Sequence, residues 1–195
     1  MDDRPPSAGM YAAVDVHYLG ETGARAALVT AADPEFGAVL WSKTAMTPAA
    51  PAYRPGEFWR RELPPVRAAC EGVAGLAMIV IDGYVDLSPT GRPGLGAHVH
   101  TELGLPVIGV AKTFFRGAVH AARVRRGSSA RPLYVTAVGV EVEDAASLVE
   151  RMAGPYRIPD ALRLADRLAR GLEYPTRPHT DSQWFAGREP MTREQ

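Results

Sequence analysis

The stretch Leu76-Ala-Met-Ile-Val-Ile81 is an unbroken apolar run, and it ends at Asp82. A short run without any polar residue to face solvent is typical of a central strand that is buried on both faces. Asp82 then stands at the carboxyl end of this strand, which is the edge where ligands bind in open α/β sheets. Taken alone, Asp82-Gly83 is read better as an ordinary turn. A site at this edge therefore requires that other functional residues meet Asp82 there.

Three strand-like segments precede this run, and turn residues separate them. The segments cover residues 11–19, 24–32 and 37–44. Gly20-Glu21-Thr22-Gly23 and Asp33-Pro34-Glu35 lie between them. Such short connections favour an antiparallel meander.

The residues after the meander alternate between helical and strand-like segments. Helices are predicted at 63–73, 94–103, 143–152 and 160–171, and further strands at 106–110, 119–125 and 133–140. The first helix would hold Pro64-Pro65 in its first turn, where proline is tolerated. The order predicts an α/β fold: a mixed sheet, with three antiparallel strands and then parallel strands, flanked by helices. We expect a single domain over residues 11–171, with residues 1–10 and 172–195 as flexible termini.

Composition excludes several classes of protein. The 195 residues are 46% hydrophobic and 23% charged, which excludes a largely disordered chain. The single cysteine, Cys70, cannot form an internal disulfide or a cysteine-cluster zinc site. No apolar run approaches the roughly 20 residues of a spanning helix, and the start of the chain does not resemble a signal peptide. We therefore expect a cytoplasmic protein without a membrane partner, present as a monomer.

Asp15 lies inside the apolar segment 11–19, where aspartate is unfavourable. It either faces water from an edge strand or belongs to a buried site. If its strand neighbours the 76–81 strand, Asp15 and Asp82 meet, and two close carboxylates repel each other unless a cation lies between them. Oxygen ligands of this kind suit Mg²⁺ or Mn²⁺, and such sites cleave phosphodiester bonds.

Charge is unevenly distributed, although 22 Lys and Arg balance 22 Asp and Glu. A zero net charge argues at first against a nucleic-acid binder. However, residues 103–140 contain no acidic residue, and Phe114 and Phe115 lie among the cations of this segment: Lys112, Arg116, His120, Arg123, Arg125, Arg126 and Arg131. The segment suits phosphate contacts, and a solvated strand pair explains it equally well.

A third carboxylate, Glu62, follows Arg60-Arg61. Charge pattern alone favours a solvated helix start at this position. However, the segment Ala52-Tyr-Arg-Pro-Gly-Glu-Phe-Trp-Arg-Arg-Glu62 resembles the Pro-Tyr-x-Pro-Gly…Arg-Glu signature of the endonuclease V family. Further blocks resemble the same family in the same order: Val14-Asp15-Val16, Asp82-Gly83, Gly94-Leu-Gly-Ala-His98, Leu105-Pro-Val-Ile-Gly-Val-Ala-Lys112 and Pro155-Tyr-Arg-Ile-Pro-Asp-Ala-Leu-Arg-Leu-Ala-Asp166.

This resemblance implies a ribonuclease-H-like fold and an activity. The enzyme would be a Mg²⁺-dependent endonuclease, with Mn²⁺ as a substitute, that acts in DNA repair. It would recognise deaminated adenine (hypoxanthine, as deoxyinosine) and cleave the second phosphodiester bond on its 3′ side. Its partner would be DNA that contains deaminated purines, or RNA that contains inosine.

The resemblance also implies roles for single residues. Asp15, Glu62 and Asp82 would bind metal and act in catalysis, and Asp166 falls where the family carries a His or Asp near the site. Lys112 matches an active-site lysine, which would place positive charge near the scissile phosphate. Tyr53 matches a wedge residue that fills the space of an extruded base. The remaining roles are contacts with the base by Gly56, Gly83 and His98, and contacts with phosphates by Arg116, Arg123, Arg125 and Arg126.

The chain departs from the family pattern after Asp82. It carries Tyr84-Val85 where the family has His-Gly, and Ser88-Pro89-Thr90 where the family has His-Pro-Arg. Two alternatives therefore stay open: an inosine-specific endoribonuclease, and a protein that binds damaged nucleic acid with weak or no turnover. A dinucleotide-binding fold is also conceivable from Gly94-Leu-Gly96, but the third glycine and the preceding strand of that motif are missing.

Overall fold

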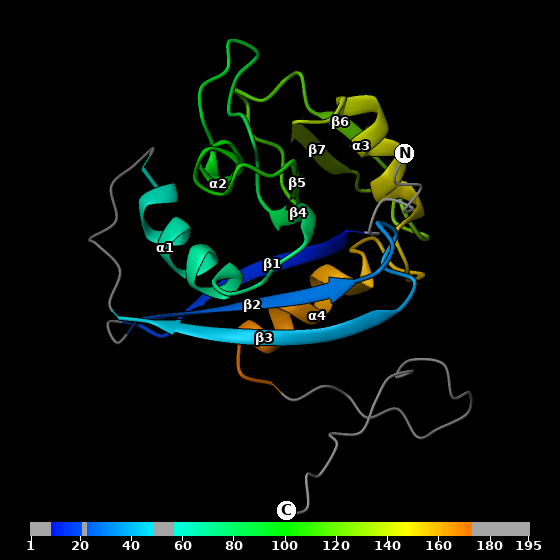
Figure 1. The fold of residues 1–195 in the computed structure, drawn as a ribbon. Helices are drawn as coiled ribbons and strands as arrows, with labels where there is room; N and C mark the ends of the chain where they lie inside the picture. Colours follow the sequence, from blue (N-terminus) through cyan, green and yellow to red (C-terminus); the bar gives the residue numbers. More distant parts are fainter. Residues whose placement is uncertain (1–8, 21–22, 49–56, 173–195) are drawn as a thin grey trace, which may run out of the picture.

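The computed structural model describes residues 9–20, 23–48 and 57–172. Within these residues seven strands form one sheet, in the order β3-β2-β1-β4-β5-β7-β6 (Figure 1). The strands are β1 (Met10–Tyr18), β2 (Ala24–Ala31), β3 (Val39–Thr47), β4 (Leu76–Asp82), β5 (Val107–Ala111), β6 (Ala122–Val124) and β7 (Leu133–Val138).

Strand β4 lies at the centre of the sheet, as its apolar sequence predicts. It pairs in parallel with both β1 and β5. Ile79, Val80 and Ile81 are at most 1% exposed, because helices cover both faces of the sheet. Strands β1, β2 and β3 pair antiparallel, which confirms the predicted meander.

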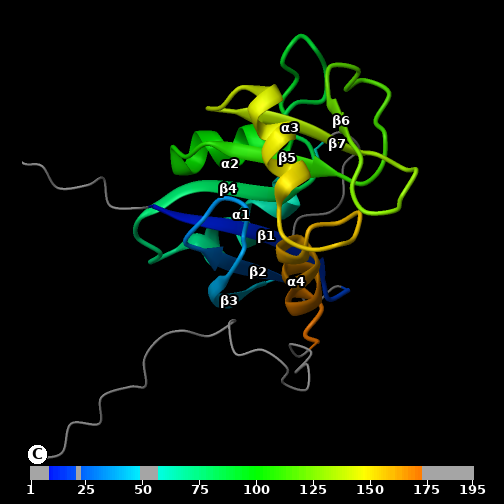
Figure 2. The same ribbon diagram turned by 90° about the vertical axis from the view of Figure 1, so that its right-hand side faces the viewer.

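Four helices cover the two faces of the sheet in the described residues: α1 (Trp59–Cys70), α2 (Leu95–Leu103), α3 (Val142–Arg151) and α4 (Asp160–Ala169). Helices α1 and α2 lie on one face, and α3 and α4 on the other (Figures 1 and 2). Side chains of β4 alternate between the two faces, so that Ile79 packs beneath α1 and α2, whereas Val80 joins the α3 side. None of the described helices has the length and apolarity needed to cross a membrane.

Helix α1 begins earlier than the sequence predicts, at Trp59 rather than at Leu63. Pro64 and Pro65 therefore lie beyond its first turn, where the missing N–H groups leave the carbonyls of Arg60 and Arg61 without their helical donors. Burial compensates: the inner stripe of α1 consists of Glu62, Pro65, Val66, Ala69 and Cys70.

Arg126 lies in the interior, and this corrects its predicted role in phosphate binding. The residue is only 5% exposed. Its guanidinium donates hydrogen bonds to four backbone carbonyls at and beyond the end of α3: those of Glu150 (3.2 Å), Met152, Gly154 (3.1 Å) and Tyr156 (3.0 Å). A buried cation whose donors are used in this way holds the α3–α4 connection and is not available to DNA.

We predict that Arg126→Ala lowers the free energy of unfolding by about 2–4 kcal/mol, because it leaves several buried carbonyls without donors. The neighbouring exposed residue provides a matched control: Arg125→Ala should change stability by less than about 0.5 kcal/mol. Urea denaturation of both variants measures the difference. Equal stability of the two variants would contradict the structural role of Arg126.

Candidate active site

Strand pairing brings Asp15 and Asp82 together. In the parallel register Val14 lies opposite Ile81, so the next residues, Asp15 within β1 and Asp82 at the end of β4, lie side by side. The backbone N–H of Val16 donates to Oδ1 of Asp15 at 2.8 Å. The juxtaposition expected from sequence is therefore present, and the reading of Asp15 as a solvated edge residue is wrong.

Helix α1 adds the carboxylate of Glu62 to this pair. Glu62 lies on the inner stripe of the helix and is 9% exposed, which excludes a solvated helix start. Burial, and then the charges of Asp15 and Asp82, raise the pKa of Glu62 from 4.5 to about 8. Burial, followed by the charge of Asp82, raises the pKa of Asp15 from 3.8 to about 7. The three carboxylates are thus electrostatically coupled.

Lys112 follows β5 and contributes the cation of the site. Its Nζ forms an ion pair with Oδ2 of Asp82. Burial opposes protonation, but the hydrogen bond and charge of Asp82, followed by the charges of Asp15 and Asp166, raise the pKa of Lys112 overall. The Arg157 guanidinium donates to the backbone carbonyl of Lys112 and, at 2.9 Å, to that of Pro132. The lysine is therefore held both by its charge and by its backbone.

Asp166 and His98 are the two remaining candidate residues among those described. Asp166, on α4, accepts a hydrogen bond from Nε of Arg170 at 2.9 Å, and its charge raises the pKa of both Asp15 and Lys112. His98 stacks on Trp59, with 3.7 Å between the ring centroids and 20° between the planes. Burial, and then the charge of Arg60, lower the pKa of His98. These contacts indicate that His98 packs α2 against α1.

A cavity of about 370 Å³ opens beside the cluster. Its polar groups include Glu62, Asp82 and Lys112, while the other lining residues are Phe58, Trp59, Gly83, Tyr84, Leu87, Leu95, Ala111 and Thr113. Gly83 adopts a φ of 148°, a conformation that favours glycine. The sequence predicted the charged groups and Gly83 but not the aromatic side chains of Phe58, Trp59 and Tyr84 that line the cavity. The only sequence signal for them was the position of Phe58-Trp59 beside the Arg-Glu motif. Tyr53 and Gly56 lie outside the described residues.

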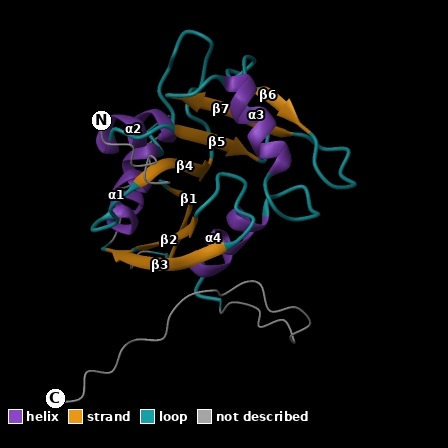
Figure 3. Ribbon diagram, turned by 45° about the vertical axis from the view of Figure 1, so that its right-hand side comes forward, coloured by secondary structure: helices purple, strands orange, loops and turns teal. Residues whose placement is uncertain are grey.

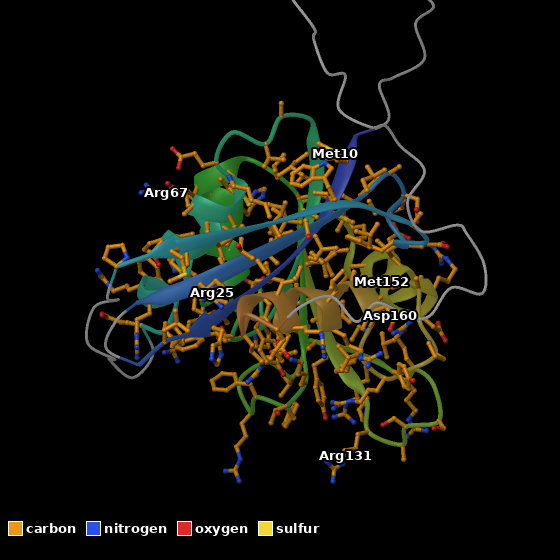
Figure 4. All side chains as sticks on the ribbon, turned by 90° about the horizontal axis from the view of Figure 1, so that it is seen from below. Met10, Arg25, Arg67, Arg131, Met152 and Asp160 are labelled. Atoms are coloured by element: carbon orange, nitrogen blue, oxygen red, sulfur yellow. The ribbon has the colours of Figure 1, made fainter. Side chains whose placement is uncertain are left out.

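The predicted phosphate-binding cations separate into two groups. Arg116, Arg123 and Arg125 are exposed, whereas Arg126 is buried as described above. Arg131 is exposed as well and projects outward from the connection between β6 and β7 (Figure 4). The exposed arginines thus lie on the part of the chain that follows Lys112.

The carboxylate cluster suits a divalent cation by its chemistry. It presents only oxygen donors, and their mutual repulsion is the energetic cost that a bound Mg²⁺ or Mn²⁺ would remove. In the described part of the chain, no three Asp, Glu, His or Cys side chains already stand in a metal-holding arrangement. Asp82 is instead turned to Lys112. A cation held by Asp15, Glu62 and Asp82 would therefore compete with Lys112 for the Asp82 carboxylate.

Comparison with known proteins identifies the family of this chain. A family model described as endonuclease V matches residues 1–139. The chain belongs to the endonuclease V family. Endonuclease V of Pyrococcus horikoshii is 34% identical over 165 residues, which cover 84% of this chain and 74% of that protein. Endonuclease V of Streptomyces avermitilis is 32% identical over 188 residues, with 85% and 81% covered.

Solved endonuclease V structures share the fold. The Streptomyces avermitilis crystal structure superposes with a TM-score of 0.70 at 29% identity, covering 86% of this chain and 82% of that chain. Endonuclease V of Ciona intestinalis, at 17% identity, superposes with a TM-score of 0.69, covering 84% of this chain and 85% of that chain. That protein was crystallised with a 24mer DNA containing an inosine followed by a ribo-adenosine.

The carboxylate cluster predicts an unusual pH dependence of stability without metal. Asp15 and Glu62 ionise less readily in the folded chain, so the folded chain holds more protons than the unfolded chain between about pH 4 and pH 8. The free energy of unfolding should therefore fall as pH rises through this window in EDTA. At pH 8, Glu62→Gln should raise it by about 1–3 kcal/mol, because a buried charge is removed.

Thermal melting at several pH values measures this effect. Glu150→Gln, at an exposed position of α3, is the matched control and should leave the melting temperature nearly unchanged. A metal-free protein whose stability rises steadily from pH 5 to pH 8, with no gain from Glu62→Gln, would show that the carboxylates do not form a repelling cluster.

Proposed function

We propose that this protein is a metal-dependent endonuclease that cleaves DNA near deaminated adenine, with Mg²⁺ as the cation and Mn²⁺ as a substitute. The observation that carries the proposal is the convergence of Asp15, Glu62 and Asp82, from three separate elements, beside Lys112 and a cavity with aromatic walls. Membership of the endonuclease V family supports the same activity.

The protein groups have distinct tasks in phosphodiester hydrolysis. Asp15, Glu62 and Asp82 would hold the divalent cation, which when bound supplies Lewis-acid stabilisation to the phosphate and makes water more acidic. Lys112, released from Asp82, places its Nζ charge beside the scissile phosphate, where negative charge accumulates in the transition state. The same lysine orients the attacking water.

The cavity supports recognition of an extruded base. Trp59 and Tyr84 provide aromatic surface, and Gly83 lets backbone groups approach a base edge, because no Cβ intervenes. Tyr53 and Gly56, from the segment before α1, would complete the pocket, with Tyr53 as the wedge in the duplex. The inosine-containing DNA bound to the Ciona intestinalis protein supports hypoxanthine as the base, and cleavage at the second phosphodiester bond on its 3′ side is part of our proposal.

The activity is tested with a labelled oligonucleotide that carries one deoxyinosine. We predict a nick with Mg²⁺ or Mn²⁺ and no nick with EDTA. Asp15→Asn and Asp82→Asn should each lower the cleavage rate by on the order of 100-fold or more, since each removes a charged oxygen ligand from the cation. Asp144→Asn, which removes an exposed carboxylate from the first turn of α3, is the control and should retain the rate.

Two outcomes would contradict the proposal and favour a different function. Tight binding of the deoxyinosine strand with no nick in either metal would identify a binding protein for damaged nucleic acid. Faster cleavage of a matched RNA that contains inosine would identify an endoribonuclease.

A separate variant tests the wedge. Tyr53→Ala should lower the preference for deoxyinosine over unmodified DNA by about tenfold, because base–aromatic contacts contribute on the order of 1–3 kcal/mol. Metal-dependent stabilisation should persist in this variant, because Tyr53 is no ligand in our proposal. An unchanged preference for deoxyinosine would reject the wedge role.

A further inference from the structure

Two phenylalanines lie exposed on the turn that follows Lys112. Phe114 is 40% exposed and Phe115 is 41% exposed, and Val119 on the same connection is 67% exposed. The connection joins β5 to β6 and is among the loops drawn in teal in Figure 3. Exposed apolar clusters of this kind mark interaction surfaces more often than isolated exposed residues do.

The turn is held in place by Tyr84, one of the residues at which this chain departs from the family pattern. The Tyr84 hydroxyl donates to the carbonyl of Thr113 at 2.8 Å and accepts from the N–H of Phe115 at 3.1 Å. The Tyr84 and Phe115 rings are also in contact, with centroids 6.3 Å apart. Tyr84 thus ties the loop after Asp82 to the loop after Lys112.

Two further contacts fix the same turn. A Cβ on Gly117 would lie 2.4 Å from the carbonyl oxygen of Leu87, so that only glycine allows these two loops to approach so closely. Phe114 packs on the Tyr134 ring with centroids 5.4 Å apart, and the Arg123 guanidinium lies 5.8 Å from the Phe114 centroid. The two phenylalanines are therefore presented by an ordered support.

The surroundings of the phenylalanines match a polyanion. The chain has no acidic residue from position 103 to 140, and Arg116, His120, Arg123 and Arg125 are exposed along this segment. Aromatic rings interleaved with such cations are the pattern by which proteins bind unpaired bases and the phosphates that join them. An apolar protein partner would gain nothing from this excess of positive charge.

We propose that Phe114 and Phe115 form a stacking platform for unpaired bases that flank the scissile phosphate. The inference rests on the proposed nuclease function, because Lys112 marks the position of that phosphate. Phe115 is three residues beyond Lys112, which limits the distance between their Cα atoms to about 11 Å. At a rise of about 3.4 Å per stacked nucleotide, the platform reaches bases within roughly three nucleotides of the cut.

The platform is distinct from the cavity beside the carboxylates. Neither Phe114 nor Phe115 lines that cavity, whereas Tyr84 and Thr113 do. Tyr84 consequently contributes to both surfaces. The arrangement favours a substrate strand whose bases next to the lesion are unpaired, so that single-stranded or locally melted nucleic acid binds more tightly than a perfect duplex.

The test is a double-mutant cycle between protein and DNA. Fluorescence anisotropy in EDTA compares two labelled single strands that contain deoxyinosine. One strand is intact, and the other has abasic residues at the three positions on the 3′ side of the scissile phosphate and at the one position between it and the deoxyinosine. For the unmodified protein we expect the abasic strand to bind about tenfold more weakly. The variant Phe114→Ala/Phe115→Ala should bind the intact strand about tenfold more weakly and show no further loss on the abasic strand.

Three controls separate stacking from other effects. Val119→Ala removes an exposed apolar residue of the same connection and should leave both affinities unchanged. Arg131→Ala removes an exposed cation of the same segment and should weaken both strands equally. Phe114→Tyr/Phe115→Tyr keeps the aromatic rings and should retain the preference for the intact strand. Thermal melting should show that the alanine variant stays folded, since neither phenylalanine belongs to the buried core.

The result that overturns the platform is an abasic penalty that persists unchanged in the alanine variant, or no abasic penalty in the unmodified protein. Nicking of the deoxyinosine strand by the same unmodified protein in Mg²⁺ tests the proposed function separately. Nicking without an abasic penalty would reject the platform alone. A penalty that the alanine variant abolishes, in a protein that does not nick, would retain the platform and reject the nuclease function.

Discussion

The repulsion between two carboxylates held side by side by strand pairing is the constraint on which the rest of this structure depends. Val14 lies opposite Ile81 in the β1–β4 pair, and this register places Asp15 next to Asp82. Glu62, which lies on α1, adds a third carboxylate and increases this repulsion. Lys112 reduces it through an ion pair with Asp82. Strongly shifted pKa values cluster at functional sites, and a divalent cation is a partner that fits three oxygen donors.

Sequence predicted the central part of this fold because its signals are local and strong. The apolar run ending at Asp82 and the short turns of the meander admit few alternatives. The predicted start of α1 was wrong because Pro64-Pro65 is typical of a first helical turn. In the structure, burial of Val66 and Ala69 against the sheet outweighs the two hydrogen bonds that these prolines cannot donate. Tertiary contacts of this kind cannot be predicted from the helix propensity of the local sequence.

The site divides in the same way. The apolar strands predicted the Asp15–Asp82 pair, and the resemblance to the endonuclease V family added Glu62 and Lys112, but the environment of single side chains was not predictable. Arg126 differs from Arg125 only by one position in the sequence, yet it is enclosed by carbonyls from the α3–α4 connection. The tether from Tyr84 to the turn at Thr113 is likewise invisible in sequence, because it joins two loops that meet only in the folded chain. The zero net charge also proved uninformative, since acidic groups gather at the cluster and exposed arginines follow Lys112.

The most direct test of the carboxylate cluster as a cation site is the number of protons released when Mn²⁺ binds. Without metal, Asp15, with a pKa of about 7, is about half protonated at pH 7, and Glu62, with a pKa of about 8, is mostly protonated. Isothermal titration calorimetry in buffers of different ionisation enthalpy measures this release. Our account predicts at least one proton per cation at pH 7, falling toward zero above pH 9, and none in Asp15→Asn/Glu62→Gln. Tight Mn²⁺ binding by the unmodified protein with no proton release at pH 7 would contradict it.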